Sequence, residues 1–240
     1  MSDGPSASGA GQERATPVRR RARPPSARAI EREQEIYETA AEIFHVKGYA
    51  ATTLQDIAQA VGLLKGSLYY YIDSKEDLLY RITRTIHENA RANLDAARAM
   101  PGPPVEKLHA LVGGHVRAFG SRLTSIRVFY TEYAVLTGDR RRQIMTERRD
   151  YEEYVFTLVR EGCTDGSFCP ELDVRVVGNA VLTMVNSVYL WYRPERDGPI
   201  DVIATKYADF AIGGLRCAPG HDHQVPSTGA RPRKSGGGGG

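Results

Sequence analysis

Residues 51–78 read ATTLQDIAQAVGLLKGSLYYYIDSKEDL, a pattern that predicts two short helices joined by a tight turn. The hydroxyl of Thr53 and the carboxylate of Asp56 are spaced to satisfy the free amides at the start of the first helix, as in a capping box. Gly62 ends this helix, and the second is predicted over residues 65–71. Two short helices around a glycine turn, braced by flanking helices, form a helix-turn-helix, so the stretch predicts contact with DNA.

Apolar residues recur at helical spacing on both sides of this unit. Ile36, Ala40, Ile43 and Phe44 share one face of a helix predicted over residues 30–47. Ser74 is placed to cap a long helix that follows the motif. Further amphipathic helices are predicted over residues 105–119, 126–136, 140–161, 174–192 and 199–215. Because no alternating strand pattern longer than a few residues occurs, the sequence predicts an all-α fold of about nine helices.

The two ends of the chain differ from its middle in composition. Residues 1–29 and 218–240 contain few large apolar side chains, so burial cannot offset the entropy cost of ordering them, and both are predicted to be disordered. The first segment carries a net charge of +4, whereas residues 30–217 carry −3. A mildly acidic body that binds DNA needs a local basic and polar face, helped by its arms. We therefore predict a basic arm (1–29), a helix-turn-helix domain (30–77), a ligand-binding and dimerisation domain (78–217) and a tail (218–240).

Several classes of protein do not fit this sequence. The most apolar stretch, residues 180–192, is interrupted by Asn186 and is too short for a membrane span, and the N-terminus lacks a signal-peptide core. Three cysteines without CxxC spacing are typical of a reducing compartment. We therefore expect a cytoplasmic protein with no membrane partner.

Motifs of catalysis and cofactor binding do not occur. The chain has no glycine-rich phosphate loop, nucleophile elbow or paired carboxylates, so no catalytic residue, cofactor or metal site is predicted. His221 and His223 lack further ligands nearby in the sequence. His109 and His115 are too far apart to share one helix face, although either can line a cavity as a single polar group.

The helix-turn-helix stretch closely resembles the DNA-binding signature of TetR-type repressors. That signature is roughly TT-x-x-IA-x-x-x-G, a short linker, then G-[ST]-LY-x-x-F-x-x-K-x-x-L, and the match extends back to AEIFHVKGY at residues 41–49. Ile72 stands where the family usually has Phe, and Leu63-Leu64 leaves the second helix without a Ser or Thr cap. The resemblance implies a DNA-binding N-terminal domain and a larger helical domain that dimerises and senses a small molecule.

Candidate DNA contacts lie on the second helix of the motif and around it. The leading end of such a helix approaches base edges and phosphates. The resemblance implies base-methyl and phosphate contacts for Tyr70 and Tyr71, and phosphate contacts for Lys75 and Thr53. Helix capping alone also explains Thr53, and Tyr69 has both a core and a phosphate interpretation, but three adjacent tyrosines at helical spacing cannot all point inward. The predicted DNA contacts are Thr53, Lys65, Gly66, Ser67, Tyr69, Tyr70, Tyr71 and Lys75.

The last two predicted helices are the most apolar of the chain. Their apolar positions exceed what one face needs to cover a monomer core, which predicts a two-fold helical interface and hence a homodimer. The candidate interface residues are Val177, Val181, Val188, Tyr207 and Phe210.

The larger domain supplies many apolar side chains and a few polar ones, Tyr130, Tyr133, Asn186 and Trp191. This mix is typical of an apolar ligand pocket, although it also fits an ordinary core whose tyrosines are satisfied. GSLY at residues 66–69 and WYRP at 191–194 resemble a branch of the family that includes acyl-CoA-responsive regulators of lipid and sterol breakdown in actinobacteria. That resemblance implies a hydrophobic acyl-CoA effector, whose phosphates need cations near the pocket mouth. The nearest by sequence are Arg122, Arg127 and Arg193.

These expectations combine into one function with two alternatives. The leading hypothesis is a repressor that binds a palindromic operator in double-stranded DNA as a dimer and is released by a hydrophobic effector. The alternatives are a structural DNA-binding protein without an effector and, more distantly, an α-helical enzyme.

Overall fold

The computed structural model describes residues 26–217, which are helical with no strand among them, so the predicted all-α class is confirmed. The first helix, α1 (Ala27–Lys47), begins at Ala27 rather than at Ile30, because the Ser26 side chain accepts a hydrogen bond from the Ala29 amide. The predicted arm therefore overlaps α1 at its last residues. The rest of the arm and the predicted tail, with His221 and His223, lie outside the described residues.

The predicted helix-turn-helix consists of α2 (Leu54–Ala60) and α3 (Lys65–Leu68), followed by the long α4 (Lys75–Ala99). The capping box of Thr53 and Asp56 is present at the start of α2. We predicted the second helix to reach Tyr71, but α3 ends at Leu68. The amides of Tyr71 and Ile72 both hydrogen-bond to the Leu68 carbonyl, so the chain continues as a tight turn into α4.

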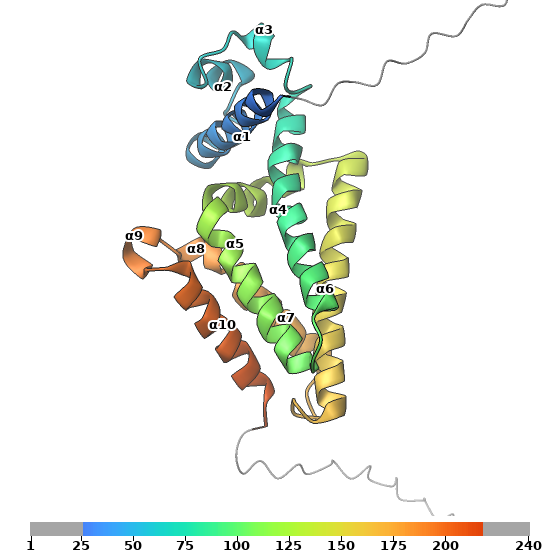
Figure 1. Cartoon of the computed structure of the whole chain (residues 1–240). Helices are drawn as coiled ribbons and strands as arrows, with labels where there is room; N and C mark the ends of the chain where they lie inside the picture. Colours follow the sequence, from blue (N-terminus) through green and yellow to red (C-terminus); the bar gives the residue numbers. More distant parts are fainter. Residues whose placement is uncertain (1–25, 218–240) are drawn as a thin grey trace, which may run out of the picture.

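A hydrophobic cluster joins α1, α2, α3 and the start of α4, and it also includes Val128, Phe129, Leu136 and Ile144 from later in the chain. Its fully buried members include Ile36, Phe44, Ile57, Leu68 and Ile72, and we call the whole group the DNA-binding-domain cluster. Ile72 is 1% exposed, so it keeps the packing role expected of an apolar residue at that position. Figure 1 shows α1, α2 and α3 gathered at one end of the molecule, at the top of α4.

The larger domain contains α5 (Pro104–Glu132), α6 (Gly138–Asp165), α7 (Val174–Asn186) and α10 (Ile200–Leu215). A 3-10 turn, η1 (Tyr133–Val135), and two one-turn helices, α8 (Val188–Trp191) and α9 (Pro194–Asp197), complete it. Two predicted helices merge into α5 across a break at Arg122, whose φ of −142° and ψ of 32° are not helical. The helix predicted over residues 174–192 is divided at Ser187 into α7 and α8.

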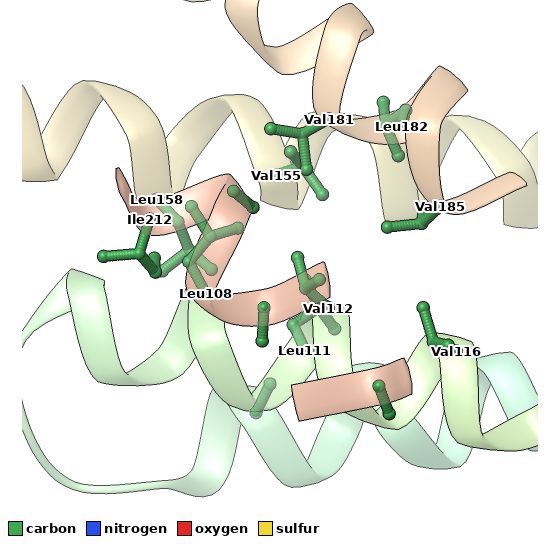
Figure 2. Packing of buried hydrophobic residues seen from close by; sticks show 14 of the residues in the cluster. Leu108, Leu111, Val112, Val116, Val155, Leu158, Val181, Leu182, Val185 and Ile212 are labelled. Atoms are coloured by element: carbon green, nitrogen blue, oxygen red, sulfur yellow. The ribbon is translucent and has the colours of Figure 1, made fainter. Parts of the chain in front are cut away.

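The core of the larger domain lies where α5, α6, α7 and α10 meet. Figure 2 shows the buried side chains of this core: Leu108, Leu111, Val112, Val116, Val155, Leu158, Val181, Leu182, Val185 and Ile212. Gly178 lets α7 approach α6 closely, because a Cβ atom there would lie 2.4 Å from a ring carbon of Phe156. Within residues 26–217, no helix has both the length and the apolar character needed to cross a membrane.

Candidate functional site

The exposed surface of α3 and the turn after it carries most of the predicted DNA contacts. Lys65, Gly66 and Ser67 are exposed at the start of α3, whereas Leu68 is buried in the DNA-binding-domain cluster. Tyr70 is 84% exposed and Tyr69 50%, so two of the three tyrosines face solvent. Tyr71 is half-buried, with its ring edge-on to that of Tyr70 at 5.1 Å. No side chain caps α3 at Leu64, as its sequence predicts.

Thr53 has a structural role at the start of α2. Its hydroxyl accepts a hydrogen bond from the Asp56 amide at 3.2 Å, and the Asp56 carboxylate accepts one from the Thr53 amide at 2.8 Å. Lys47 donates to the same carboxylate at 2.7 Å, and this bond, with those from Thr53, lowers the pKa of Asp56 to about 2. Thr53 is exposed, so its phosphate contact stays a prediction beside its capping role.

Lys75 is held by the loop between α1 and α2. Its ammonium donates to the carbonyls of Tyr49 and Thr52, each at 2.8 Å, and lies 4.3 Å from the centre of the Tyr49 ring. A third, longer hydrogen bond of 3.4 Å reaches the Ala50 carbonyl. These contacts fix the helix-turn-helix to the start of α4. A phosphate contact, as the family resemblance implies, would have to compete with them.

The helix-turn-helix domain is itself acidic. Residues 30–77 contain four Lys and Arg but nine Asp and Glu. Three of the four cations have partners within the domain: Arg32 contacts Glu35, Lys47 contacts Asp56, and Lys75 is held by carbonyls. Lys65 is exposed, and among the described residues it forms no ion pair. Positive charge for binding DNA must therefore come largely from outside this domain.

We expect replacement of Tyr70 or Lys65 by alanine to weaken operator binding by about 1–3 kcal/mol per lost contact. Both side chains are exposed and outside the core, so the melting temperature should barely change. Thermal unfolding and fluorescence anisotropy on operator DNA measure the two quantities separately. A correctly folded mutant with the affinity of the wild type would remove that residue from the DNA-contact surface.

A cavity of about 100 Å³ lies in the larger domain between α4, α5, α6 and α7. Apolar side chains make up much of its wall, among them Ile86, Leu94, Phe119, Ile126, Phe129 and Leu182. Of the predicted ligand residues, Tyr130 and Asn186 line it, and the Tyr130 hydroxyl donates a hydrogen bond to the Asn186 carbonyl oxygen at 2.6 Å. His115 lines the cavity too, as the sequence allowed for either His109 or His115.

The polar groups on one wall of the cavity satisfy one another. The Asn93 amide donates to the Tyr151 hydroxyl at 3.2 Å, which leaves that hydroxyl free to donate to His115 Nδ1 at 3.1 Å. The Asn186 side chain raises the pKa of His115, but less strongly than burial lowers it. Burial lowers the pKa of His115 to about 4 and raises the pKa of Tyr151 and Tyr130, so all three groups are neutral near pH 7.

His87 on α4 also lines the cavity, and its surroundings differ. The side chain is buried, with its ring edge-on to Phe129 at 5.1 Å. Its Nδ1 lies 3.6 Å from a carboxylate oxygen of Glu147, which in turn accepts two hydrogen bonds from Arg84 at 2.6 and 2.8 Å. Burial lowers the pKa of His87 to about 4; Glu147 raises it, but less strongly. The neutral imidazole is therefore the form present near pH 7.

The remaining predicted ligand residues lie outside the lining of this cavity. Trp191 donates to the Tyr207 hydroxyl at 3.2 Å, and Tyr133 lies under the Arg148 guanidinium. Arg127 donates to the carbonyls of Tyr189 and Tyr192, and Arg193 to that of Tyr192, so both hold the segment around α8. Arg122 lies at the break in α5. Only part of the predicted ligand set therefore lines the cavity. Two of its arginines bind backbone carbonyls instead, and the sequence does not indicate such contacts.

Most residues of the cavity lining were not in the predicted ligand set, among them four uncharged polar ones: His87, Asn93, His115 and Tyr151. A signal for two of them exists in α4, where His87 and Asn93 interrupt a face that otherwise carries Ile82, Ile86, Ala90 and Leu94. Polar residues on the buried face of a helix need internal partners, which is a recognisable mark of a cavity or a hydrogen-bonded network.

The predicted dimer residues fall into two groups. Val181 and Val188 are 6% and 0% exposed and belong to the core of the protomer, so Val188 is not accessible to a partner in this structure. Phe210 is 73% exposed, and Val177 and Tyr207 are half-buried. Three further exposed apolar residues lie on or beside the same helices and were not predicted: Val176, Leu190 and Val202. Contact with a partner stays a prediction for the exposed group.

Comparison with known proteins assigns both halves of the chain. Residues 36–82 match the family described as bacterial regulatory proteins, tetR family, and residues 101–215 match a tetracyclin repressor-like C-terminal domain. The HTH-type transcriptional repressor KstR2 of Rhodococcus jostii is 28% identical over 185 residues, which cover 77% of this chain and 91% of that protein.

Two solved structures have the same fold. The ketosteroid transcriptional regulator KstR2 of Mycobacterium tuberculosis superposes with a TM-score of 0.73 at 26% identity, covering 78% of this chain and 96% of its own. AibR, solved with isovaleryl coenzyme A and operator DNA, superposes with a TM-score of 0.65 at 28% identity, covering 77% and 97%.

Proposed function

The chain belongs to the TetR family of bacterial transcriptional regulators, and from this premise we propose that it is a ligand-responsive repressor. It binds a palindromic operator as a homodimer through α3 and the turn that follows. A hydrophobic effector in the cavity between α4, α5, α6 and α7 releases it. The observation that carries this proposal is that α5 and α4 each line the cavity and also pack into the DNA-binding-domain cluster.

The first of these helices is α5. After the break at Arg122, Ile126, Phe129 and Tyr130 line the cavity. Val128, on the same turn, is 1% exposed and belongs to the DNA-binding-domain cluster, and so does Phe129. A ligand that displaces this segment of α5 therefore also changes its contacts with the DNA-binding domain.

The second helix is α4, which runs from one domain into the other (Figure 1). Leu78, Leu79 and Ile82 at its start are buried in the DNA-binding-domain cluster, and His87 and Leu94 further along line the cavity. Packed interiors shift between discrete arrangements rather than deforming continuously. A changed cavity wall is thus expected to reorient α2 and α3 relative to the partner protomer.

The chemistry of the cavity suits an acyl-CoA, and the ligand bound in the AibR structure, isovaleryl coenzyme A, belongs to this class. A cavity of about 100 Å³ holds part of an acyl group, so the coenzyme portion would lie outside it. Arg91 and Arg148 contribute to the cavity lining, so we expect them to contact the thioester's phosphates, for which Arg91 would have to leave its pair with Asp95. Arg127 and Arg193 are engaged by backbone carbonyls. An effector that prefers the DNA-incompetent conformation ~100-fold supplies roughly 2.7 kcal/mol of coupling.

The proposal is tested by footprinting the protein on its own upstream DNA and then titrating a panel of CoA thioesters and their free acids. We expect a palindromic footprint that a hydrophobic acyl-CoA removes and the free acid does not. The emission of Trp191, the single tryptophan, should change on binding. Trp191 is two residues after Tyr189, whose ring stacks at 4.5 Å on that of the cavity residue Tyr130.

Two results would count against this function. Binding to DNA without regard to sequence would favour a structural DNA-binding protein. A sequence-specific footprint that no thioester removes, without any change in fluorescence, would exclude an acyl-CoA and leave another hydrophobic effector.

A further inference from the structure

His87 Nε2 is the one buried side-chain nitrogen or oxygen without a hydrogen-bond partner among residues 26–217. The residue is 7% exposed and lines the cavity. By contrast, hydrogen bonds join Asn93, Tyr151 and His115 in the cavity wall, and a further one joins Tyr130 to Asn186. A buried polar atom left without a partner destabilises a protein, so this nitrogen marks a place where a bound molecule can add a hydrogen bond.

The surroundings of His87 determine which kind of group it can bind. Its Nδ1 faces the Glu147 carboxylate at 3.6 Å, and that carboxylate accepts two hydrogen bonds from Arg84. A carboxylate favours the proton on the ring nitrogen nearest to it. The neutral ring therefore carries its proton on Nδ1 and presents a lone pair at Nε2. Such a nitrogen accepts a hydrogen bond and cannot donate one.

We propose that the buried part of the effector carries a hydroxyl group that donates a hydrogen bond to His87 Nε2. This inference rests on the proposed function, in which the cavity is the effector site. A hydroxyl fits because it is the smallest neutral donor. A charged ammonium would have to lose its water in a cavity whose lining sets Arg91 and Arg148 against Glu147 and Glu152, so it would gain no net attraction to offset that loss.

The consequence is discrimination among ligands of equal size. A ligand with a hydroxyl satisfies the nitrogen, whereas one with only a carbonyl brings a second acceptor against it and one without polar atoms leaves it unpaired. Sites built to bind a hydroxyl reject analogues that lack it more strongly than apolar pockets reject a change in size. His87 thus acts as a specificity-determining residue, while the apolar wall provides most of the contact area.

Three six-membered rings of similar size test this directly: cyclohexanol, cyclohexanone and methylcyclohexane. Apolar cavities of this order of volume take up single rings. Binding to the full chain is measured from the NMR signals of its histidine rings, with the His87 signal assigned by substitution. We expect cyclohexanol to bind about tenfold more tightly than cyclohexanone, with the largest shift at His87.

The matched variants are His87→Phe and His109→Phe. His109 lies at the surface between α5 and α10, where it contacts Asp209 at 3.0 Å, so its replacement should leave the preference for the alcohol unchanged. His87→Phe should abolish that preference and bind methylcyclohexane at least as well as cyclohexanol. If His87→Phe does not fold, the affinities of the wild-type protein for the three ring compounds still test the inference.

The inference is overturned if cyclohexanol does not bind, if cyclohexanol and cyclohexanone bind equally, or if the preference persists in folded His87→Phe. Operator binding is measured in parallel. Cyclohexanol that binds at His87 without any effect on the operator complex would contradict the proposed function while leaving the hydroxyl assignment intact.

Discussion

Replacing Phe210 and Val176 together by glutamate is expected to give a folded monomer whose affinity for a palindromic operator is at least about 100-fold lower. Phe210 on α10 and Val176 on α7 are 73% and 64% exposed, so neither belongs to the protomer core. In a two-fold interface each substituted residue occurs twice, so four carboxylates would lose water without gaining partners. Analytical ultracentrifugation reports the dimer, and an electrophoretic shift assay reports operator binding.

Val181, which apolar spacing placed among the interface candidates, belongs to the protomer core. Glutamate at Val181 would place a charge in the protomer core, where only 6% of the residue is exposed, and would unfold the chain rather than divide a dimer. The matched control places the same two charges at Thr146 and Thr164, exposed residues of α6. An operator-binding dimer that survives the Phe210 and Val176 substitutions would refute this interface.

Deletion of residues 1–24 is expected to reduce the salt dependence of operator binding strongly. The deletion removes five arginines, while the helix-turn-helix domain has only four basic residues against nine acidic ones. Each lost phosphate contact reduces the log–log slope of affinity against salt by about 0.9, so the slope should fall by up to about 4 or 5. Arginines of such arms can also enter the minor groove next to a half-site.

The control for this deletion keeps the length of the arm. Replacing the five arginines by glutamine should reproduce the lower slope, whereas replacing them by lysine should largely restore it. Affinity is measured by fluorescence anisotropy over a series of salt concentrations. A slope unchanged by the deletion would show that the arm does not contact DNA, and the source of positive charge would have to be sought elsewhere.

The fold was largely predictable because its signals are local. Apolar spacing locates the helices, Thr53 with Asp56 marks the start of α2, and Gly62 marks the turn, all within a few residues of chain. The errors arise where tertiary contacts override local signals. The tyrosine run predicts a longer α3, yet Leu68 and Ile72 turn inward to the cluster and end the helix early.

The candidate site was predictable only in part, for the same physical reason. Exposure of Tyr70 follows from helical spacing, and so does an apolar wall with Tyr130 and Asn186. The pairing of His115 with Tyr151 joins residues 36 positions apart, and the capture of Arg127 by the Tyr192 carbonyl spans 65 positions. Apolar spacing does separate helices between residues 119 and 126, where α5 bends at Arg122, but it does not give the angle of that bend or the distant partners that the packing brings together.

In the proposed function the state of the cavity sets the affinity for the operator, and Ala118→Phe tests this coupling without knowledge of the effector. Ala118 lines the cavity on α5, so a phenyl group there occupies the space that an effector would take. Ala92→Phe on the exposed side of α4 is the matched control. Operator affinity is measured for both by fluorescence anisotropy, with circular dichroism to confirm the fold. We predict that Ala118→Phe binds the operator at least about tenfold more weakly than the control, within the usual range of coupling between two sites. A folded Ala118→Phe protein that no longer takes up cyclohexanol, yet binds the operator as the wild type does, would contradict coupling between the cavity and the operator.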